Sequence, residues 1–219
     1  MTGSFLSFEG IDGSGKTTQL QLLRERLLAQ GRDVIVAQEP GGTRVGNEIR
    51  RLLLDAANSD LRPLPELLLY FASRAQNIDE VILPALEAGK TVLVDRFTDA
   101  TVAYQGYGRE LGVDVVRSIE QAACRGLKPG LTLLIDDDLA VALPRAQARN
   151  SGQAQDEGRM EGQSRAFYER VRRGYLDLSR QEPERIKVVD GSGTVEEVAG
   201  RVAALADPYL RARQPAKAR

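Results

Sequence analysis

The 219-residue sequence contains no histidine, and this absence limits the chemistry that the protein can perform. A Ser-His-Asp triad, a histidine general base and a histidine-ligated metal site are all excluded. Catalysis would have to rely on carboxylates, lysine, arginine and a hard cation. Phosphoryl transfer needs little else, because it depends mainly on positioning and charge neutralisation. An acceptor that is itself a phosphate is already largely dianionic at pH 7 and needs no base.

Cysteine is nearly absent, and long apolar runs are missing. The single cysteine, Cys124, excludes an internal disulfide, and its place in an expected helix predicts a packed thiol rather than a nucleophile. No apolar run approaches the roughly 18 residues of a membrane-spanning helix, and the N-terminus does not resemble a signal peptide. The 30 basic and 31 acidic residues nearly cancel, so no overall charge attracts nucleic acid. We therefore expect a cytoplasmic protein that binds neither membranes nor nucleic acid.

Apolar strand patterns alternate with helical patterns along the whole chain, without an internal repeat or a linker. This alternation predicts an α/β fold with a parallel sheet flanked by helices on both faces. We expect one domain over residues 1–206 and a disordered basic tail over residues 207–219. The expected strands are 5–8, 34–37, 91–94, 131–135 and 186–189, and the expected helices are 17–30, 45–55, 65–88, 99–104, 113–125, 139–149, one from about 161, and 195–206.

The most informative motif lies between the first expected strand and the first expected helix. Residues 10–17 read GIDGSGKT and fit the phosphate-binding pattern G-x-x-x-x-G-K-[ST]. Glycines let backbone N–H groups surround an anion, and the N-terminus of the following helix favours negative charge. Lysine supplies charge for the outer phosphates, and threonine offers a hydroxyl to Mg²⁺. We therefore expect ATP and Mg²⁺ to bind at Gly10, Ile11, Asp12, Gly13, Ser14, Gly15, Lys16 and Thr17.

Carboxylates follow several of the expected strands. In open parallel sheets, ligands gather at the carboxyl ends of the strands, and Asp12, Glu39, Asp95 and Asp136 all lie at or just after such ends. Asp95 is placed like a carboxylate that holds Mg²⁺ directly or through water. It can also serve as a helix N-cap or as a partner of Arg96, and these roles are compatible with metal binding.

Beyond the phosphate loop, further motifs are specific enough to indicate a family. FEGIDGSGKTTQ (8–19), EPGGT (39–43), DRFTDATVAYQGYGR (95–109) and ERVRRGYLDL (169–178) resemble the motifs of thymidylate kinases. The resemblance extends from residue 5 to about residue 206. It implies a P-loop NTPase fold with five parallel strands, a mobile lid at about residues 145–160, and a homodimer. It also implies transfer of the γ-phosphoryl group of Mg·ATP to dTMP, giving dTDP in the pathway to dTTP.

The resemblance implies roles for the residues of the acceptor site. Asp12 would accept a hydrogen bond from the 3′-hydroxyl, Tyr70 would stack on thymine, and Arg74 would donate to thymine O4. Phe71 competes with Tyr70, but a shift of one residue turns a helical side chain by about 100°. Tyr104 would exclude ribonucleotides. The implied substrate-binding residues are Asp12, Glu39, Arg50, Tyr70, Arg74, Arg96, Thr101, Tyr104 and Gln105, with Arg50 and Arg96 on the acceptor phosphate and Thr101 and Gln105 on the base edge.

Catalysis also needs positive charge over the transferring phosphoryl group. Some thymidylate kinases carry an arginine within the phosphate loop, but residues 12–14 contain none here. The complementary arrangement places arginines in the lid, where Arg145 and Arg149 are one helical turn apart, just after Pro144. A solvated basic face is the alternative interpretation. The implied catalytic residues are Lys16, Arg96, Arg145, Arg149 and Arg159, and the implied metal ligands are Thr17 and Asp95.

Two other functions share the phosphate loop. One is a kinase for a different nucleoside monophosphate, which a comparison of dTMP, dUMP and dCMP as acceptors separates. The other is a nucleotide switch that hydrolyses ATP or GTP and places water where we place dTMP. The chain has no N/T-K-x-D sequence for reading guanine, which argues against a GTP switch.

Overall fold

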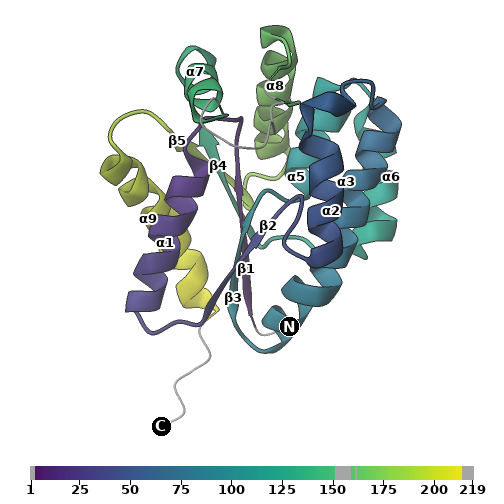
Figure 1. The fold of residues 1–219 in the computed structure, drawn as a ribbon. Coiled ribbons are helices and arrows are strands. Elements are labelled where there is room, and N and C mark those ends of the chain that lie inside the picture. Colours follow the sequence, from purple (N-terminus) through teal and green to yellow (C-terminus); the bar gives the residue numbers. More distant parts are fainter. Residues whose placement is uncertain (1–2, 151–158, 161, 214–219) are drawn as a thin grey trace.

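A computed structural model of the chain describes residues 3–150, 159–160 and 162–213, without the side chains of residues 149 and 150. Its centre is a five-stranded parallel sheet with the strand order β2-β3-β1-β4-β5 (Figure 1). The predicted α/β fold with a parallel sheet is therefore confirmed. The strands are β1 Ser4–Glu9, β2 Val34–Gln38, β3 Thr91–Asp95, β4 Leu131–Asp136 and β5 Ile186–Asp190.

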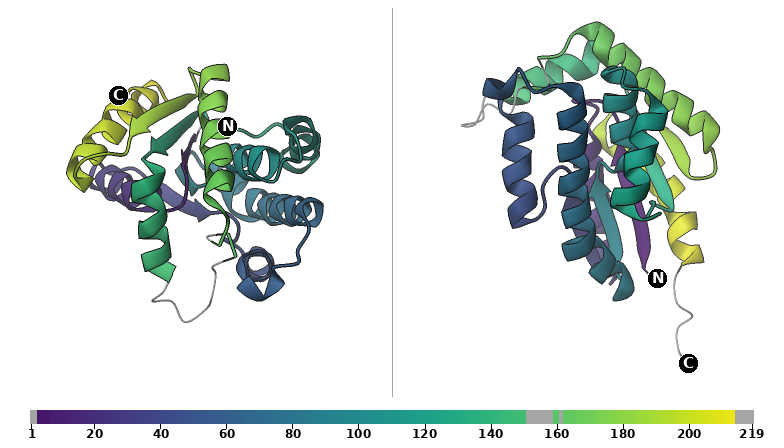
Figure 2. Two further views of the ribbon diagram at one scale, coloured as in Figure 1. Left: turned by 90° about the horizontal axis from the view of Figure 1, so that it is seen from above. Right: turned by 90° about the vertical axis from the view of Figure 1, so that its right-hand side faces the viewer.

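Helices cover both faces of the sheet, as its apolar strands require. One face packs against α1 and α9, which lie side by side, and the other against a layer that includes α3, α6 and α8 (Figures 1 and 2). The helical elements are α1 Lys16–Ala29, α2 Arg44–Leu54, η1 Ala56–Asn58, α3 Pro63–Asn77, η2 Ile78–Ile82, α4 Leu83–Glu87, α5 Thr98–Thr101, η3 Val102–Gly108, α6 Val113–Cys124, α7 Leu139–Asn150, α8 Arg165–Gln181 and α9 Val195–Ala212.

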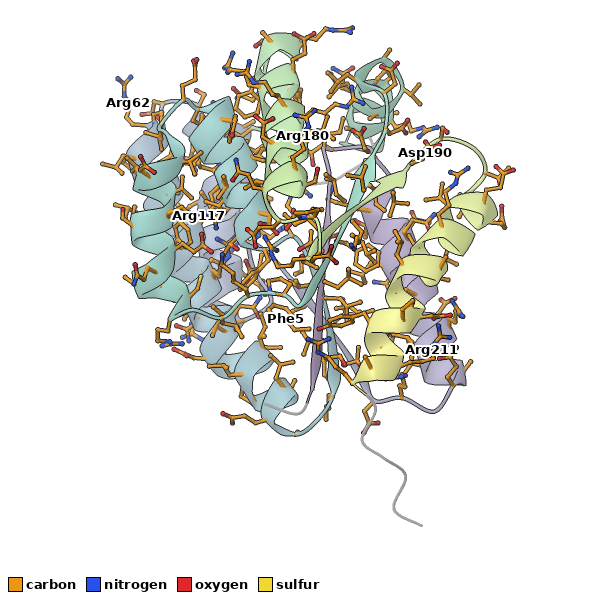
Figure 3. The ribbon with its side chains drawn as sticks, turned by 180° about the vertical axis from the view of Figure 1, so that it is seen from behind. Phe5, Arg62, Arg117, Arg180, Asp190 and Arg211 are labelled. Atoms are coloured by element: carbon orange, nitrogen blue, oxygen red, sulfur yellow. The ribbon has the colours of Figure 1, made fainter. Side chains whose placement is uncertain are left out.

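The central strands are buried on both sides. Phe5 of β1 belongs to the core on one face, and Leu6 to the core on the other. Figure 3 shows Phe5 inside the molecule, whereas Arg62 points outward from the surface. In the register of β1 and β3, Phe8 lies opposite Asp95. The ends of these two strands therefore meet at one edge of the sheet, which brings the phosphate loop close to Asp95.

All five predicted strands are confirmed to within about two residues, but two helical predictions missed π-helical segments. The helix expected over 65–88 is interrupted by η2, and the one expected over 99–104 continues as the π-helix η3. A π turn adds one residue to the helical repeat without changing which residues are apolar. Among the described residues, no helix combines the length and the apolar character that crossing a bilayer requires.

The last helix differs from the prediction. It was expected to end near Ala206, but it continues through Pro208 to Ala212, so the tail does not begin at residue 207. Burial explains the difference, because Leu210 lies in the core and Asp207 binds Arg26 at 2.7 Å. The hydroxyl of Tyr209 also donates to the carbonyl of Phe5 at 3.1 Å. Residues 214–219 lie outside the described part of the chain.

Candidate active site

A cavity of about 310 Å³ opens at the carboxyl ends of β1, β2 and β3, where strand-end ligands were predicted. The phosphate loop, the segment after β2, helix α3 and the segment after β3 all contribute to it. Asp136, at the end of β4, binds Arg172 and does not line the cavity. The cavity is lined by Asp12, Lys16, Thr17, Gln38, Glu39, Pro40, Arg50, Leu54, Tyr70, Arg74, Asp95, Arg96, Ala100, Thr101, Tyr104, Gln105 and Met160.

The phosphate loop has the backbone conformation that its glycines predict. Gly15 has φ +86° and begins α1, in a region that side-chain-bearing residues rarely adopt. Gly13 has φ +79°, and a Cβ there would lie 1.9 Å from the carbonyl oxygen of Ala142 in α7. Lys16 is buried, and its Nζ lies 3.4 Å from the carbonyl of Ile11. The loop therefore places Lys16 at the cavity, and at Gly13 it leaves no room for a side chain beside α7.

Two oxygen ligands meet where a metal was predicted. The Thr17 hydroxyl donates to Asp95 at 2.5 Å, and both side chains line the cavity. Mg²⁺ prefers oxygen ligands and is bound by one or two carboxylates together with phosphate and water. Within the described part of the chain, no cluster of three or more His, Cys, Asp or Glu side chains has the arrangement to hold a metal. The donor set therefore fits Mg²⁺ that arrives with a nucleotide.

Arg96 connects the two sides of the cavity. Its Nη2 donates to Asp12 at 2.6 Å and to the Tyr104 hydroxyl at 3.1 Å, and that hydroxyl donates to the other oxygen of Asp12 at 3.0 Å. Burial alone would lower the pKa of Arg96, but Tyr104 and Asp12 hold it well above its usual value. Burial raises the pKa of Tyr104 well above its usual value. A charged guanidinium therefore faces the cavity beside a neutral phenol.

Helix α3 separates the two aromatic residues that competed for the stacking role. Tyr70 lines the cavity, and Phe71 lies in the core. The guanidinium of Arg74 lies 5.0 Å from the ring centroid of Phe71, so this ring forms part of the arginine's support. Burial, with a contribution from Glu66, raises the pKa of Tyr70 to about 12, which keeps the phenol neutral. The placement favours Tyr70 over Phe71 as the stacking residue.

Arg74 is held rigidly by the protein. Its Nε donates to Glu39 at 2.5 Å, its Nη1 to Thr101 at 2.9 Å and its Nη2 to the carbonyl of Phe97 at 3.1 Å. Glu39 raises the pKa of Arg74 even though burial acts in the opposite direction. Glu39 was predicted to bind substrate. Its carboxylate lies at the cavity but is bonded to Arg74, so the structure places it as the partner that orients the arginine.

Gln105 and Arg159 meet at a buried carboxylate that the sequence did not single out. Glu66 is fully buried and accepts from Gln105 at 2.8 Å, from Arg109 at 3.0 Å and from Arg159 at 2.7 Å. The backbone N–H of Arg159 also donates to the carbonyl of Leu54. Arg159 is absent from the cavity lining. The structure places it in an ion pair with the buried Glu66, apart from the residues that line the cavity, and its role as a catalytic arginine stays a prediction.

Of the other two lid arginines, Arg145 is not among the residues that line the cavity. Arg145 is largely exposed on α7 and donates to Asp137 at 2.9 Å. Arg149 lies in the same helix, but its side chain and residues 151–158 are outside the described part of the chain. Pro144 does not end α7, which runs on to Asn150. The structure therefore leaves the roles of Arg145 and Arg149 as predictions.

Some lining residues were missed by reasoning from the sequence. Gln38 and Pro40 flank Glu39 at the end of β2, and Ala100 lies four residues before Tyr104, so helical and strand-end patterns contained a signal for them. Leu54 and Met160 carried none, because an apolar residue near a loop resembles any core residue. Arg50, which was predicted, lines the cavity and donates to the carbonyl of Pro40 at 3.1 Å.

Comparisons with known proteins agree with this geometry. A family model described as thymidylate kinase matches residues 8–202. A thymidylate kinase from Geobacter sp. (strain M21) is 54% identical over 196 residues, which cover 89% of this chain and 87% of the relative. A thymidylate kinase from Syntrophotalea carbinolica is 51% identical over 90% of this chain and 92% of its own length. One from Desulfovibrio desulfuricans is 47% identical over 95% and 97% of the two chains.

Proposed function

Since the chain belongs to the thymidylate kinase family, we propose that the cavity at the ends of β1, β2 and β3 is where ATP and dTMP meet. The reaction of this family, phosphorylation of dTMP to dTDP with ATP as donor, is the activity of this enzyme. One observation supports the assignment of the cavity above others. The predicted acceptor residues and the predicted phosphate-loop and metal residues Lys16, Thr17 and Asp95 all line it.

On the donor side, the phosphate loop holds the phosphates of ATP. Its backbone N–H groups and the start of α1 face the β-phosphate, and the ammonium of Lys16 neutralises the outer phosphates. Thr17 and Asp95 are the residues that would hold Mg²⁺. When bound, Mg²⁺ neutralises charge on the β- and γ-phosphate oxygens. The transferring group then lies between Lys16 and Arg96, two cations of the same cavity.

On the acceptor side, the nucleotide lies with its base toward α3 and its phosphate toward Arg96. Tyr70 stacks on thymine, and Arg74, rigidly oriented by Glu39, donates to O4. Thr101 and Gln105 border the same end of the cavity and contact the edge of the base. Arg96 and Arg50 bind the acceptor phosphate.

The sugar lies between Asp12 and Tyr104. Asp12 accepts from the 3′-hydroxyl, and the ring of Tyr104 leaves no room for a 2′-hydroxyl. Because the acceptor phosphate is already dianionic at pH 7, attack requires alignment and charge neutralisation but no general base. This agrees with a sequence that lacks histidine.

The lid arginines Arg145 and Arg149 remain the proposed cover for the transferring phosphoryl group. They follow from the family resemblance and from the absence of arginine at residues 12–14. Arg159 is not included, because it is bonded to Glu66. A homodimer and a cytoplasmic location likewise remain proposals from the resemblance. Exposed leucines on α2 and α3 support the dimer.

Two assays test the proposed function. In ADP formation with dTMP, dUMP and dCMP as acceptors, dTMP should be faster than dCMP, because Arg74 donates to an oxygen at the position where cytosine carries an amino group; dUMP, which has the same oxygen, differs from dTMP only by the 5-methyl group. Phosphate release without an acceptor should be slow. A preference for dCMP would contradict the roles of Tyr70 and Arg74. Rapid phosphate release that dTMP does not change would indicate a nucleotide switch instead.

A further inference from the structure

Arg96 has a backbone conformation that needs an explanation. Its φ is +70°, in the left-handed region that residues with a side chain seldom adopt. Such a conformation is unfavourable for a residue with a side chain and persists only where neighbouring contacts enforce it. Arg96 is also the cavity arginine bonded to Asp12 and Tyr104. Whatever enforces this backbone conformation therefore also determines where the guanidinium lies.

Two consecutive residues of β1 hold the backbone on both sides of Arg96. The N–H of Arg96 donates to the carbonyl of Phe8 at 3.0 Å, which extends the pairing of β1 with β3. The next N–H, that of Phe97, donates to the side chain of Glu9 at 2.7 Å. The regular pairing ends at Phe8 and Asp95, so a side-chain oxygen accepts the following hydrogen bond. This contact fixes the peptide after Arg96, and the contact with Phe8 fixes the one before it.

The carboxyl group of Glu9 is itself held from its other side. Tyr175 of α8 donates its hydroxyl to the second oxygen of Glu9 at 2.8 Å. The ring of Tyr175 packs edge-on against that of Tyr104, with centroids 6.3 Å apart. Glu9 is fully buried and does not line the cavity. It therefore acts on the site only through its neighbours.

A glutamate is an unexpected residue at this fully buried position, which suggests that its carboxyl group has a specific function. A fully buried carboxyl is unfavourable when charged, and an apolar or amide side chain would fill the space without this cost. Burial, with Asp99 adding to it, raises the pKa of Glu9 to about 8, so the group is mainly neutral at pH 7. A neutral carboxyl group in this position provides a hydrogen-bond acceptor at a distance from the backbone that the length of the side chain sets, and it does not provide a charge.

We propose that Glu9 is a positioning residue for Arg96: its side chain binds the Phe97 N–H and thereby holds the Arg96 guanidinium where the acceptor phosphate arrives. This inference rests on the proposed role of Arg96 in binding that phosphate. It assigns no contact between Glu9 and either substrate. The property that matters is the reach of the side chain, not its charge.

Two substitutions of Glu9 separate the effect of its side-chain length from the effect of its charge. Glu9→Gln keeps the length and an accepting oxygen but cannot ionise. Glu9→Asp keeps the carboxyl but is shorter by one carbon–carbon bond, about 1.5 Å, which moves the oxygen out of hydrogen-bonding range of Phe97. We expect Glu9→Asp to raise the KM for dTMP about tenfold and leave the KM for ATP within about twofold, because about 1.4 kcal/mol of acceptor binding is lost. Glu9→Gln should keep both KM values within about threefold of the wild type.

The ratio of the two KM values is the decisive readout, because a reduced fraction of folded enzyme lowers kcat but does not change that ratio. Damage by Glu9→Gln with a normal Glu9→Asp would show that Glu9 acts by charge and would overturn the proposal. Equal changes in both KM values would reduce Glu9 to a structural residue. Arg96→Ala, measured alongside, should raise the KM for dTMP. If it does not, the role of Arg96 itself fails, and that result is distinct from a failure of Glu9 alone.

Discussion

Tyr104 has two separable functions at the scale of single residues. Its hydroxyl joins Arg96 to Asp12, with distances of 3.1 and 3.0 Å, while its ring borders the cavity. The hydroxyl helps to orient the charged groups of Arg96 and Asp12, and the ring fills part of the cavity wall. Substitutions that remove one without the other can therefore assign discrimination between deoxyribose and ribose to one of them.

We predict that Tyr104→Ala relaxes the rejection of ribo-TMP and that Tyr104→Phe does not. The alanine variant removes the ring that we propose crowds the 2′ position, and the phenylalanine variant keeps it. The measurement is the ratio of kcat/KM for dTMP to kcat/KM for ribo-TMP, which should fall about tenfold or more in the alanine variant alone. An equal fall in both variants would instead attribute the selectivity to the hydroxyl and its hydrogen bonds.

Glu9 also makes a prediction about stability and pH. The pKa of Glu9 is about 8 in the folded state against an ordinary value of 4.5, so the folded protein binds the proton more tightly. Its contribution to stability is complete below pH 4.5 and is lost as the pH rises through 8. Burial raises this pKa most and the charge of Asp99 in α5 adds to it, whereas the N–H of Phe97, Arg96 and Tyr175 lower it.

The thermal midpoint of the wild type, relative to Glu9→Gln, should therefore fall steadily between pH 5 and pH 8.5. The glutamine cannot ionise, and every other titrating group is common to both proteins, so its effect cancels in the difference. The absence of histidine removes the side chain that most often titrates in this range. A difference that is independent of pH would mean that Glu9 remains charged in the folded state.

At the scale of elements, the phosphate loop and α7 fit each other closely. The Cβ of a residue at position 13 would lie 1.9 Å from the carbonyl of Ala142, whereas a Cβ at position 15 meets no atom within 4 Å. Both glycines have positive φ, so both substitutions by alanine carry backbone strain of roughly 1–2 kcal/mol. Only the first also collides with the backbone of another helix.

We therefore predict that Gly13→Ala lowers the thermal midpoint distinctly more than Gly15→Ala, because a backbone atom of α7 has to move. The free energy of unfolding, measured by denaturant titration, should differ between the two variants by about 1–3 kcal/mol. Gly15→Ala serves as the matched control, since it has the same strain in open space. Equal losses would show that α7 adjusts freely to the loop.

Patterns along the chain predicted most elements but not every feature of them. Apolar alternation and helical spacing placed the five strands, and strand ends placed Asp12, Glu39 and Asp95 together at the cavity. The π-helical segments η2 and η3 could not be predicted from the sequence pattern, because they depend on one extra residue per turn rather than on a change of composition. The extension of α9 was missed because Leu210 is buried in a core cluster with residues of β1 and α1, which are far away in the sequence.

At the scale of the whole molecule, the residues predicted for the acceptor site come together because they lie close to strand ends, whereas Arg159 lies apart from them because its position depends on a contact that is distant in sequence. The predicted acceptor residues lie in short motifs anchored to strand ends or on α2 and α3, and they line one cavity. Arg159 is bonded to Glu66, which is 93 residues away along the chain. No pattern near either residue indicates this pair, since only the packing of α3 against the segment before α8 brings them together.

The quaternary structure is the remaining property at this scale. The right-hand view of Figure 2 shows α2 and α3 side by side on one flank of the molecule. These helices carry exposed hydrophobic side chains, with Leu52 52% exposed on α2 and both Leu64 and Leu68 48% exposed on α3. Leu64 and Leu68 are four residues apart and so lie on one face of α3. Large apolar groups gathered on neighbouring helices are typical of a surface that another protein chain covers.

We predict that the wild type is a dimer through this flank and that Leu68→Lys makes it a monomer. Burying a lysine between two chains without a partner is unfavourable, whereas an exposed lysine costs a monomer almost nothing. Light scattering coupled to size-exclusion chromatography measures the mass directly. Leu28→Lys is the matched control, because Leu28 is 41% exposed on α1, which packs on the opposite face of the sheet. It should leave the mass unchanged. A wild-type monomer, or a dimer that survives Leu68→Lys and dissociates with Leu28→Lys, would place any contact between copies elsewhere.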